Sequence, residues 1–173
     1  NRGGRSAEAV QALRDGLAKA GEHPLLLINL AAIMNYRPEP TPQEIFDVHV
    51  RLGKSITAVA GGGFRPILVS PDPERKLRVG YLSQDFRDHS VAHFLKPILA
   101  HHNRALYEPV LYSSTAQPDA TTRELAAAAA GFVDASRMPD QALDQRIHGD
   151  RVDILVDLSG HTAGSRVALM ARR

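Results

Sequence analysis

Residues 77–93 read LRVGYLSQDFRDHSVAH, and this stretch decides the fold. Its first seven residues are typical of a buried strand, which is followed by a polar loop and then by a helix from Ser90 onward. In an open α/β sheet, ligands bind at the carboxyl ends of the strands. The polar side chains of this loop, among them Asp85, His89 and His93, are therefore candidates for a functional site.

The same alternation of strand and helix continues toward the C-terminus. The pattern predicts a helix over 90–102 with a kink or break at Pro97, strands over 107–113, 131–135 and 153–158, helices over 121–130 and 139–149, and a further helix from Gly164. Short strands separated by helices of about ten residues predict parallel βαβ units with helices on both faces of one sheet. The fold class is thus α/β, with a Rossmann-like parallel sheet over residues 77–173.

Residues 1–60 show a helical pattern only. Helices are predicted over 7–20 with Ser6 as its cap, over 24–34, and over 42–59 with Thr41 as its cap and Gly61-Gly62-Gly63 after it. The apolar residues of the second helix cover most of its circumference, so we expect it to pack on more than one side. Residues 61–76, which are rich in proline, are predicted to link this helical segment to the sheet.

Composition excludes several classes of protein. The 173 residues are 43% hydrophobic and 23% charged, which is normal for a globular domain. A net charge of +2 is too weak to indicate nucleic acid or an anionic membrane as a partner. The chain has no cysteine, which excludes disulfides and thiolate chemistry, and its longest apolar run, residues 24–34, is too short to span a bilayer. We expect a soluble, cytoplasmic protein.

Two histidines lie four residues apart where the helix after the first strand begins. His89 and His93 could bind a metal, but no glutamate follows the first histidine and a third ligand is missing from the pattern. One histidine could instead act as a general base or contact a substrate, because its ordinary pKa of about 6.5 suits proton transfer near neutrality. Alternatively, His89 caps the helix and His93 packs beneath it. Farther along, His101 and His102 are expected at the surface.

A second polar loop, DLSGHTAG at residues 157–164, follows the last predicted strand. Gly160 and Gly164 would let the backbone approach a ligand, and the N–H groups at the next helix start suit a phosphate or a sugar. In the alternative interpretation, Asp157 and Ser159 only satisfy backbone donors of the connection. Both polar loops are expected at the same edge of the sheet.

Two blocks of the chain resemble the start of the catalytic region of the O-linked N-acetylglucosamine transferase family. The first is LRVGYLSQDFRDH within residues 76–92, and the second is DILVDLSGHT at residues 153–162, followed by Ser165-Arg166. Upstream, Asn35-Tyr36, PQEIF at residues 42–46 and His49 resemble the segment that joins tetratricopeptide repeats to that region in bacterial members. Animal members typically have proline at the position of Ser90 and tyrosine at that of His161.

The resemblance implies a fold with two Rossmann-like lobes and an active site between them. It also implies an enzyme that transfers N-acetylglucosamine from UDP-N-acetylglucosamine to Ser or Thr hydroxyls of proteins, with inversion and with no metal or other cofactor. Residues 1–60 would be the end of tetratricopeptide-like repeats that present the protein acceptor. Residues 77–173 would be the first lobe and incomplete, so we expect the chain to be the N-terminal part of an enzyme that also has a second lobe and upstream repeats.

The resemblance also assigns the site residues. His89 matches a histidine of the family that lines the cleft, and it is predicted to be catalytic, as a base or as a positioning group. The predicted substrate-binding residues are Asp85, Ser159, Gly160, His161 and Thr162, and His93 is expected to pack or to support His89. The two alternatives are a non-catalytic α/β interaction domain and a glycosyltransferase of the same fold that acts on a small molecule.

Overall fold

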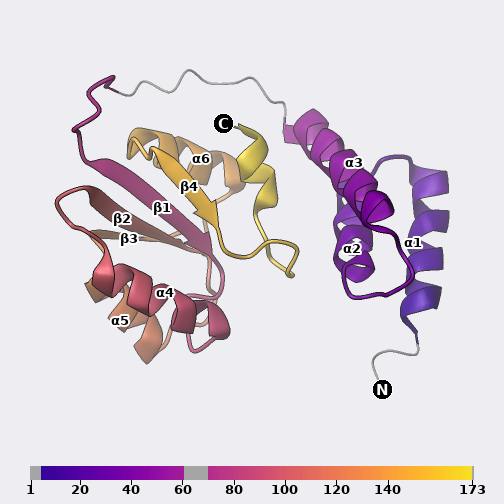
Figure 1. Ribbon diagram of the computed structural model, residues 1–173, viewed down its shortest axis with the longest axis horizontal. Coiled ribbons are helices and arrows are strands. Elements are labelled where there is room, and N and C mark those ends of the chain that lie inside the picture. Colours follow the sequence, from indigo (N-terminus) through magenta and orange to yellow (C-terminus); the bar gives the residue numbers. More distant parts are fainter. Residues whose placement is uncertain (1–4, 61–69, 173) are drawn as a thin grey trace. The chain divides into compact units, whose positions relative to one another are not determined.

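The computed structural model describes residues 5–60 and 70–172, which form two compact units (Figure 1). The first unit contains three helices together with His161–Ala163 and residues 171–172. The second unit contains a β-sheet and its helices, in residues 70–160 and Gly164–Met170. In the part of the chain that the structure describes, no helix is long and apolar enough to cross a membrane.

The first unit is built from helices α1 (Ser6–Ala20), α2 (Pro24–Met34) and α3 (Pro42–Ala60). Helix α2 contacts both of the others, as its apolar circumference predicted. Its buried side chains are Leu27, Leu30, Ala31 and Met34. The turn before α2 is fixed to α3, because the Arg51 guanidinium donates to both carboxylate oxygens of Glu22 at 3.0 and 2.8 Å.

The two predicted helix caps have different outcomes. The cap of α3 is confirmed, since Glu44 N donates to Thr41 Oγ1 at 3.2 Å and Thr41 N donates to Glu44 Oε2 at 2.7 Å. The cap by Ser6 is wrong, because Ser6 is already the first helical residue and its hydroxyl accepts a hydrogen bond from Arg37 Nη1 at 3.0 Å. The predicted helix stop at Gly61–Gly63 lies outside the described residues.

The second unit contains one parallel sheet of four strands in the order β3-β2-β1-β4. The strands are β1 (Leu77–Ser83), β2 (Tyr107–Ser113), β3 (Gly131–Asp134) and β4 (Ile154–Asp157). The central strand β1 pairs with β2 and β4, so that Leu82 lies opposite Tyr112 on one side and Asp157 on the other. The predicted α/β fold with a parallel sheet is confirmed.

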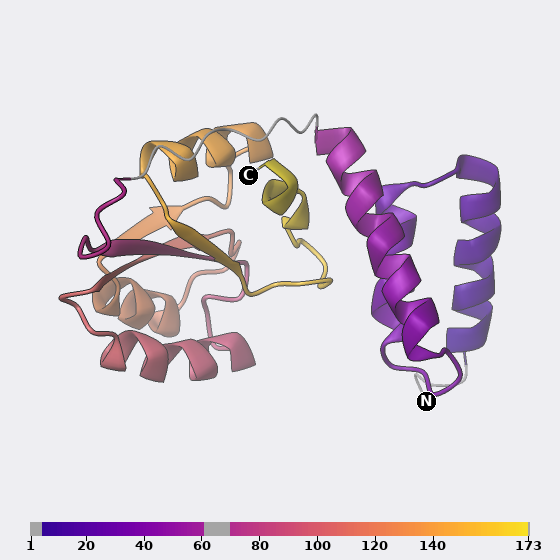
Figure 2. The same cartoon turned by 45° about the horizontal axis from the view of Figure 1, so that its top comes forward.

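Helices cover both faces of the sheet (Figure 2). Helices α4 (Ser90–His101) and α5 (Ala120–Ala128) lie on one face, and α6 (Asp140–Gly149) lies on the other with the 3-10 helix η1 (Val167–Arg172). Helix α4 continues through Pro97, so the predicted break does not occur. The helix expected from Gly164 begins only at Val167 and has the tighter 3-10 form.

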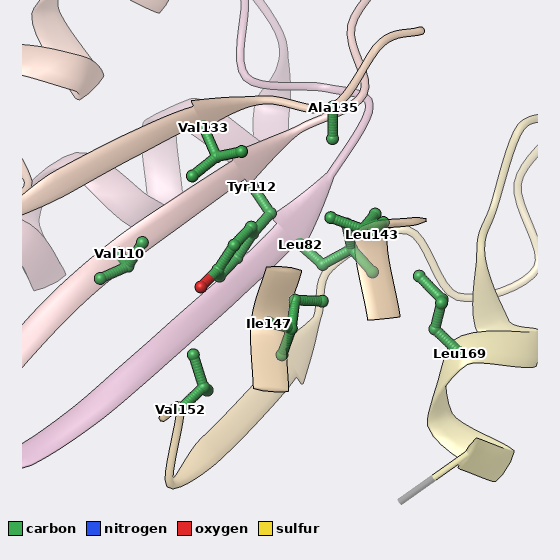
Figure 3. Packing of buried hydrophobic residues seen from close by; sticks show 9 residues of the cluster. All are labelled: Leu82, Val110, Tyr112, Val133, Ala135, Leu143, Ile147, Val152 and Leu169. Atoms are coloured by element: carbon green, nitrogen blue, oxygen red, sulfur yellow. The ribbon is translucent and has the colours of Figure 1, made fainter. Parts of the chain in front are cut away.

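Alternating side chains of the strands form two cores, as a period of two residues requires. On one face, Val79 and Tyr81 of β1 pack with α4 and α5. On the other face, Leu82 and the fully buried Tyr112 pack with α6 and η1 (Figure 3). A Cβ atom at Gly80 would lie 3.1 Å from Cε2 of Tyr112, so glycine at this position leaves room for the tyrosine ring.

Candidate functional site

The two polar loops lie side by side at the carboxyl edge of the sheet, because β1 and β4 are neighbours. Leu158 N donates to Leu82 O at 3.0 Å, which extends the pairing by one residue. Beyond it, the Oγ atoms of Ser83 and Ser159 are 3.5 Å apart, and Gln84 N donates to Ser159 Oγ at 3.4 Å. The prediction that both loops share one edge is therefore confirmed.

Each of the four strands ends in the same local motif. A side-chain oxygen of the last strand residue accepts a hydrogen bond from the backbone N–H two residues later. The acceptors and their distances are Ser83 at 3.0 Å, Ser113 at 3.4 Å, Asp134 at 2.9 Å and Asp157 at 3.1 Å. These hydrogen bonds restrain the backbone just after each strand, so the loops at this edge begin from defined positions.

His89 is the N-cap residue of α4 and is half-buried. Its Nδ1 atom accepts a hydrogen bond from Val91 N at 3.3 Å, so the predicted cap is confirmed. Because Nδ1 is an acceptor, the neutral ring carries its proton on Nε2. The ring therefore offers a donor, and not a lone pair, with its second nitrogen.

His93 does not pack beneath His89. Its side chain is 72% exposed, and its Nε2 atom lies 3.9 Å from the exposed carboxylate of Asp88. The expectation that His93 packs or supports His89 is wrong, because position 93 lies on the solvent side of α4. Among the residues that the structure describes, no three His, Asp or Glu side chains come together in a way that could hold a metal ion.

Asp85 and Ser159 are buried at the base of the two loops. Asp85 N donates to Ser83 Oγ, and the Asp85 carboxylate lies 3.5 Å from the Arg87 guanidinium. Both residues thus belong to the region that sequence analysis indicated. In the structure, however, their contacts are with other parts of the loops.

The loop after β4 is shaped by Asp157 and two glycines. The Asp157 carboxylate accepts hydrogen bonds from Ser159 N at 3.1 Å and from Gly160 N at 2.9 Å, which confirms that it satisfies backbone donors of the connection. Gly160 and Gly164 have φ angles of +55° and +79°, a region that favours glycine. A Cβ atom at Gly164 would lie 2.1 Å from Gln84 Oε1, so the two loops approach each other closely here.

The remaining residues of this loop are more accessible. Gly160 and Thr162 are exposed, and His161 is half-buried. His161 is grouped with the helical unit, in which its Nε2 atom lies 3.0 Å from Nε2 of His49. His49 Nδ1 lies 2.7 Å from the carbonyl oxygen of Ile45, to which only a protonated nitrogen can donate. In the neutral pair, His161 is therefore the donor to His49.

Three residues that fix the first loop were not indicated by the sequence, one of them within the loop and two at the start of α5. Gln84 packs against Gly164, as described above, and Asp119 and Thr122 at the start of α5 bind the backbone of residues 86 and 88. The spacing Asp119-x-x-Thr122 is a helix-start signal that could have been found. The hydrogen bonds of Asp119 and Thr122 to residues more than thirty positions earlier could not be predicted, because no local sequence pattern indicates them.

Comparisons with known proteins agree on one family. Residues 64–173 match the profile described as glycosyl transferase family 41. SPINDLY of Arabidopsis thaliana, a probable UDP-N-acetylglucosamine–peptide N-acetylglucosaminyltransferase, is 33% identical over 162 residues, which are 89% of this chain and 16% of SPINDLY. SEC of the same plant, which has the same probable activity, is 33% identical over 98 residues, or 56% of this chain and 10% of SEC.

A solved structure is similar over almost the whole chain. A mutant of the O-GlcNAc transferase from Thermobaculum terrenum has a TM-score of 0.88 and 29% sequence identity. The match covers 98% of this chain and 32% of that chain. This chain spans only 16% of the length of SPINDLY and 32% of the solved chain, so each of these proteins has extensive further parts.

Proposed function

The chain belongs to glycosyl transferase family 41, and from this premise we propose that it forms the N-terminal part of a protein O-N-acetylglucosaminyltransferase. The whole enzyme would transfer N-acetylglucosamine from UDP-N-acetylglucosamine to Ser or Thr hydroxyls of proteins, with inversion. The observation that carries this proposal is the meeting of two loops at one sheet edge, where each lies in a block that resembles the family.

In this reaction, the acceptor hydroxyl oxygen attacks C1 of the sugar from the face opposite the diphosphate. A bond forms between that oxygen and C1, the bond from C1 to the phosphate oxygen breaks, and UDP leaves with the electron pair. The hydroxyl proton must pass to a base as the new bond forms. A site for such a transfer needs an oriented hydroxyl and donors for the charge that develops on the diphosphate.

We assign to His89 the role of a donor that contacts substrate through Nε2–H. Its Nδ1 atom is engaged by Val91 N, which keeps the proton of the neutral ring on Nε2. To act as a base through Nε2, the ring would have to move its proton to Nδ1 and give up the helix cap. The geometry thus favours orientation of the sugar or the acceptor hydroxyl over removal of its proton.

The loop after β4 is proposed to supply the neighbouring substrate contacts. Gly160 and Thr162 are exposed and able to touch donor or acceptor, and His161 lies beside them. Asp85 and Ser159 are buried, so we propose that they act chiefly by holding the two loops in shape.

Other parts of the same polypeptide are proposed to complete the enzyme. A second lobe would bind most of the nucleotide, and helical repeats upstream would continue α1–α3 and present the protein acceptor. UDP-N-acetylglucosamine is the proposed donor, with no metal or other cofactor. This division is consistent with the small share of each relative that the chain spans.

The test is an assay of the full-length polypeptide with UDP-N-acetylglucosamine and a protein extract, with detection of UDP release and of modified Ser or Thr by mass spectrometry. We expect His89→Asn to reduce transfer about 100-fold, because the Nε2–H donor is lost from the site. The helix cap is kept, because Asn is itself a good N-cap residue. His93→Ala is the matched control, since this exposed histidine is one turn away, and its transfer rate should equal that of the wild type.

Each of the other outcomes points to a different function. Sugar transfer to small acceptors but not to proteins would indicate a small-molecule transferase of the same fold. Binding of UDP without any transfer would indicate a non-catalytic domain. Wild-type rates in His89→Asn would remove His89 from the site.

A further inference from the structure

We propose that Asp119 and Thr122 are positioning residues for His89, in addition to capping α5. They would hold the backbone just before His89 and thereby fix the place of its ring at the sheet edge. This inference rests on the proposed function in one respect only, namely that the His89 ring contacts the substrate. The restraint on the loop itself can be tested without any transfer assay.

Asp119 and Thr122 first form a reciprocal cap of α5. Thr122 N donates to Asp119 Oδ1 at 2.9 Å, and Asp119 N donates to Thr122 Oγ1 at 2.9 Å. These two bonds satisfy the donors that a helix start leaves open. The second carboxylate oxygen of Asp119 is not needed for this cap. The Thr122 hydroxyl lies 3.2 Å from Asp119 Oδ1 but has a closer acceptor, the carbonyl oxygen of Phe86.

Both of these groups bind the loop that leads to His89. Asp88 N donates to Asp119 Oδ2 at 2.7 Å, and the Thr122 hydroxyl donates to Phe86 O at 2.6 Å. The loop is thus fixed at two backbone positions in the three residues before His89. The Phe86 side chain is fully buried in the core between the sheet and helices α4 and α5. This burial restrains the same segment of the loop through its side chain.

The bond from Asp88 N to Asp119 is strengthened by charge. The backbone N–H of Asp88 and then that of Thr122 lower the pKa of the Asp119 carboxyl, so the group is ionised at neutral pH. Hydrogen bonds to an ionised acceptor are roughly twice as strong as bonds between neutral groups. Thr122 is buried, so its hydroxyl makes its bond with little competition from water.

The position of His89 follows directly from this restraint. His89 is the next residue after Asp88 and is itself the cap of α4, so both caps meet at one place on the sheet edge. Misplacement of a substrate-contacting group by about 1 Å can reduce a rate about 100-fold. Loss of the bonds from α5 should therefore reduce catalysis, although neither residue touches the substrate.

The first experiment measures backbone amide exchange in Thr122→Val, Thr122→Ser and a matched control. Thr122→Val keeps the shape but removes both hydroxyl bonds, and we expect amides of residues 86–91 to exchange roughly tenfold faster. Thr122→Ser restores the hydroxyl and should restore protection. Lys96→Met breaks the 2.6 Å ion pair between Lys96 and Glu124, which joins the same two helices away from the loop, and should leave these amides unchanged.

The second experiment measures transfer by the full-length enzyme. We expect kcat of Thr122→Val and Asp119→Asn to fall roughly tenfold to 100-fold, with KM for the donor within about twofold of wild type and with recovery in Thr122→Ser. In the His89→Asn background, Thr122→Val should have almost no further effect, because the group that it positions is gone.

Three results would overturn the proposal. The first is unchanged exchange and kcat in Thr122→Val. The second is an equal loss in Lys96→Met, and the third is an undiminished effect of Thr122→Val in the His89→Asn background. If Thr122→Val does not fold, Asp119→Asn is judged by the same criteria.

Failure of the wild type to transfer any sugar would count against the proposed function. The amide exchange experiment would still decide whether Asp119 and Thr122 restrain the loop.

Discussion

The two edges of the parallel sheet are held in different ways. At the amino edge, where β1 and β4 begin, the strands are joined by ionised side chains. The Arg75 guanidinium donates two bonds to the Asp153 carboxylate at 2.8 and 2.7 Å, and Arg78 pairs with Glu108 at 2.9 Å. At the carboxyl edge, the connections are mainly from hydroxyl or carboxylate oxygens to backbone N–H groups, as at Ser83 and Asp157.

This difference predicts that the amino edge contributes mainly to stability and that the carboxyl edge contributes mainly to the proposed site. At the amino edge, ion pairs link side chains that lie in different strands or just before them, and each of these charges has an opposite partner. The turns at the carboxyl edge fix the backbone locally and lead into the loops that carry His89 and Gly160. Substitutions at the amino edge should therefore lower the free energy of unfolding, and substitutions at the carboxyl edge should act chiefly on the site.

The largest effect on stability is expected for Asp153→Ala. The Asp153 side chain is only 7% exposed, and besides Arg75 it accepts a hydrogen bond from Arg78 N at 2.8 Å. Its removal leaves the Arg78 backbone N–H and the Arg75 guanidinium without their acceptor, which should reduce the free energy of unfolding by about 2–3 kcal/mol. Urea denaturation of the 173-residue chain measures this change.

Arg146→Met is the matched control for Asp153→Ala. Arg146 is half exposed and pairs with Asp150 at the end of the same helix, and the Tyr112 hydroxyl still donates to Asp150 in the variant. The free energy of unfolding should therefore change by less than about 1 kcal/mol. In the full-length enzyme, kcat of Asp153→Ala should stay close to that of the wild type below the unfolding range. A large loss of kcat with intact stability would contradict the division between the two edges.

A smaller effect is expected for Tyr112→Phe. The hydroxyl of this fully buried residue donates to Asp150 Oδ2 at 2.8 Å, and the ring fills the core shown in Figure 3. The substitution removes only this bond to a charged acceptor, so the free energy of unfolding should fall by about 1.5–2 kcal/mol. Thermal or urea unfolding is the measurement, and an unchanged stability would show that Asp150 is satisfied equally well by its other partners.

Most of the architecture could be predicted from the sequence, because it depends on periodicity along short segments. The strands over 77–83 and 107–113 were predicted to the residue, and the other elements of the sheet unit came within a few residues, since alternation and turn residues are local signals. Two of the errors arose where a side chain has a partner far along the chain. Ser6 binds Arg37, and His102, expected at the surface, is half-buried against Tyr81.

The sheet edge that carries the candidate site could be predicted from the sequence, but the hydrogen bonds that hold the first loop there could not. Two polar loops at the carboxyl ends of strands in one sheet predicted the edge, and His89 was identified within it. The bonds from Asp119 and Thr122 to the first loop join residues 31 and 36 positions apart, which no pattern in the sequence indicates. The exposure of His93 depends on which side of α4 packs against the sheet. Ala92, Leu95 and Leu99 face the core, so His93 is left on the solvent side.

At the carboxyl edge, Gly164→Ala should reduce stability by about 1–2 kcal/mol, because its φ of +79° is unfavourable for a residue with a side chain. The new methyl group also displaces the Gln84 side chain, so kcat should fall by more than the stability loss explains. Gly149→Ala is the control. A Cβ atom at that helical position meets nothing within 4 Å, and alanine should stabilise by roughly 0.5–1 kcal/mol. Equal effects at both glycines would contradict a special role for the loop.

The smallest effect is a dependence of stability on pH at the amino edge. His102 lies after α4, and its Nε2 atom is 2.9 Å from the Tyr81 hydroxyl. Burial, with a contribution from the nearby Arg104 charge, lowers the pKa of His102 below its usual 6.5. As the pH falls through about 6.5, the unfolded chain binds a proton that the folded chain does not, so the free energy of unfolding decreases and levels off below the folded pKa.

The variant His102→Gln isolates this contribution, since glutamine can still accept from the Tyr81 hydroxyl but does not titrate. Urea unfolding at pH 8 and at pH 5 should show a smaller decrease in stability for His102→Gln than for the wild type. His101→Gln, at the exposed neighbouring position, should keep the wild-type decrease. If both variants keep it, the acid sensitivity belongs to other groups, and the amino edge is stabilised by its ion pairs without a measurable contribution from the buried histidine.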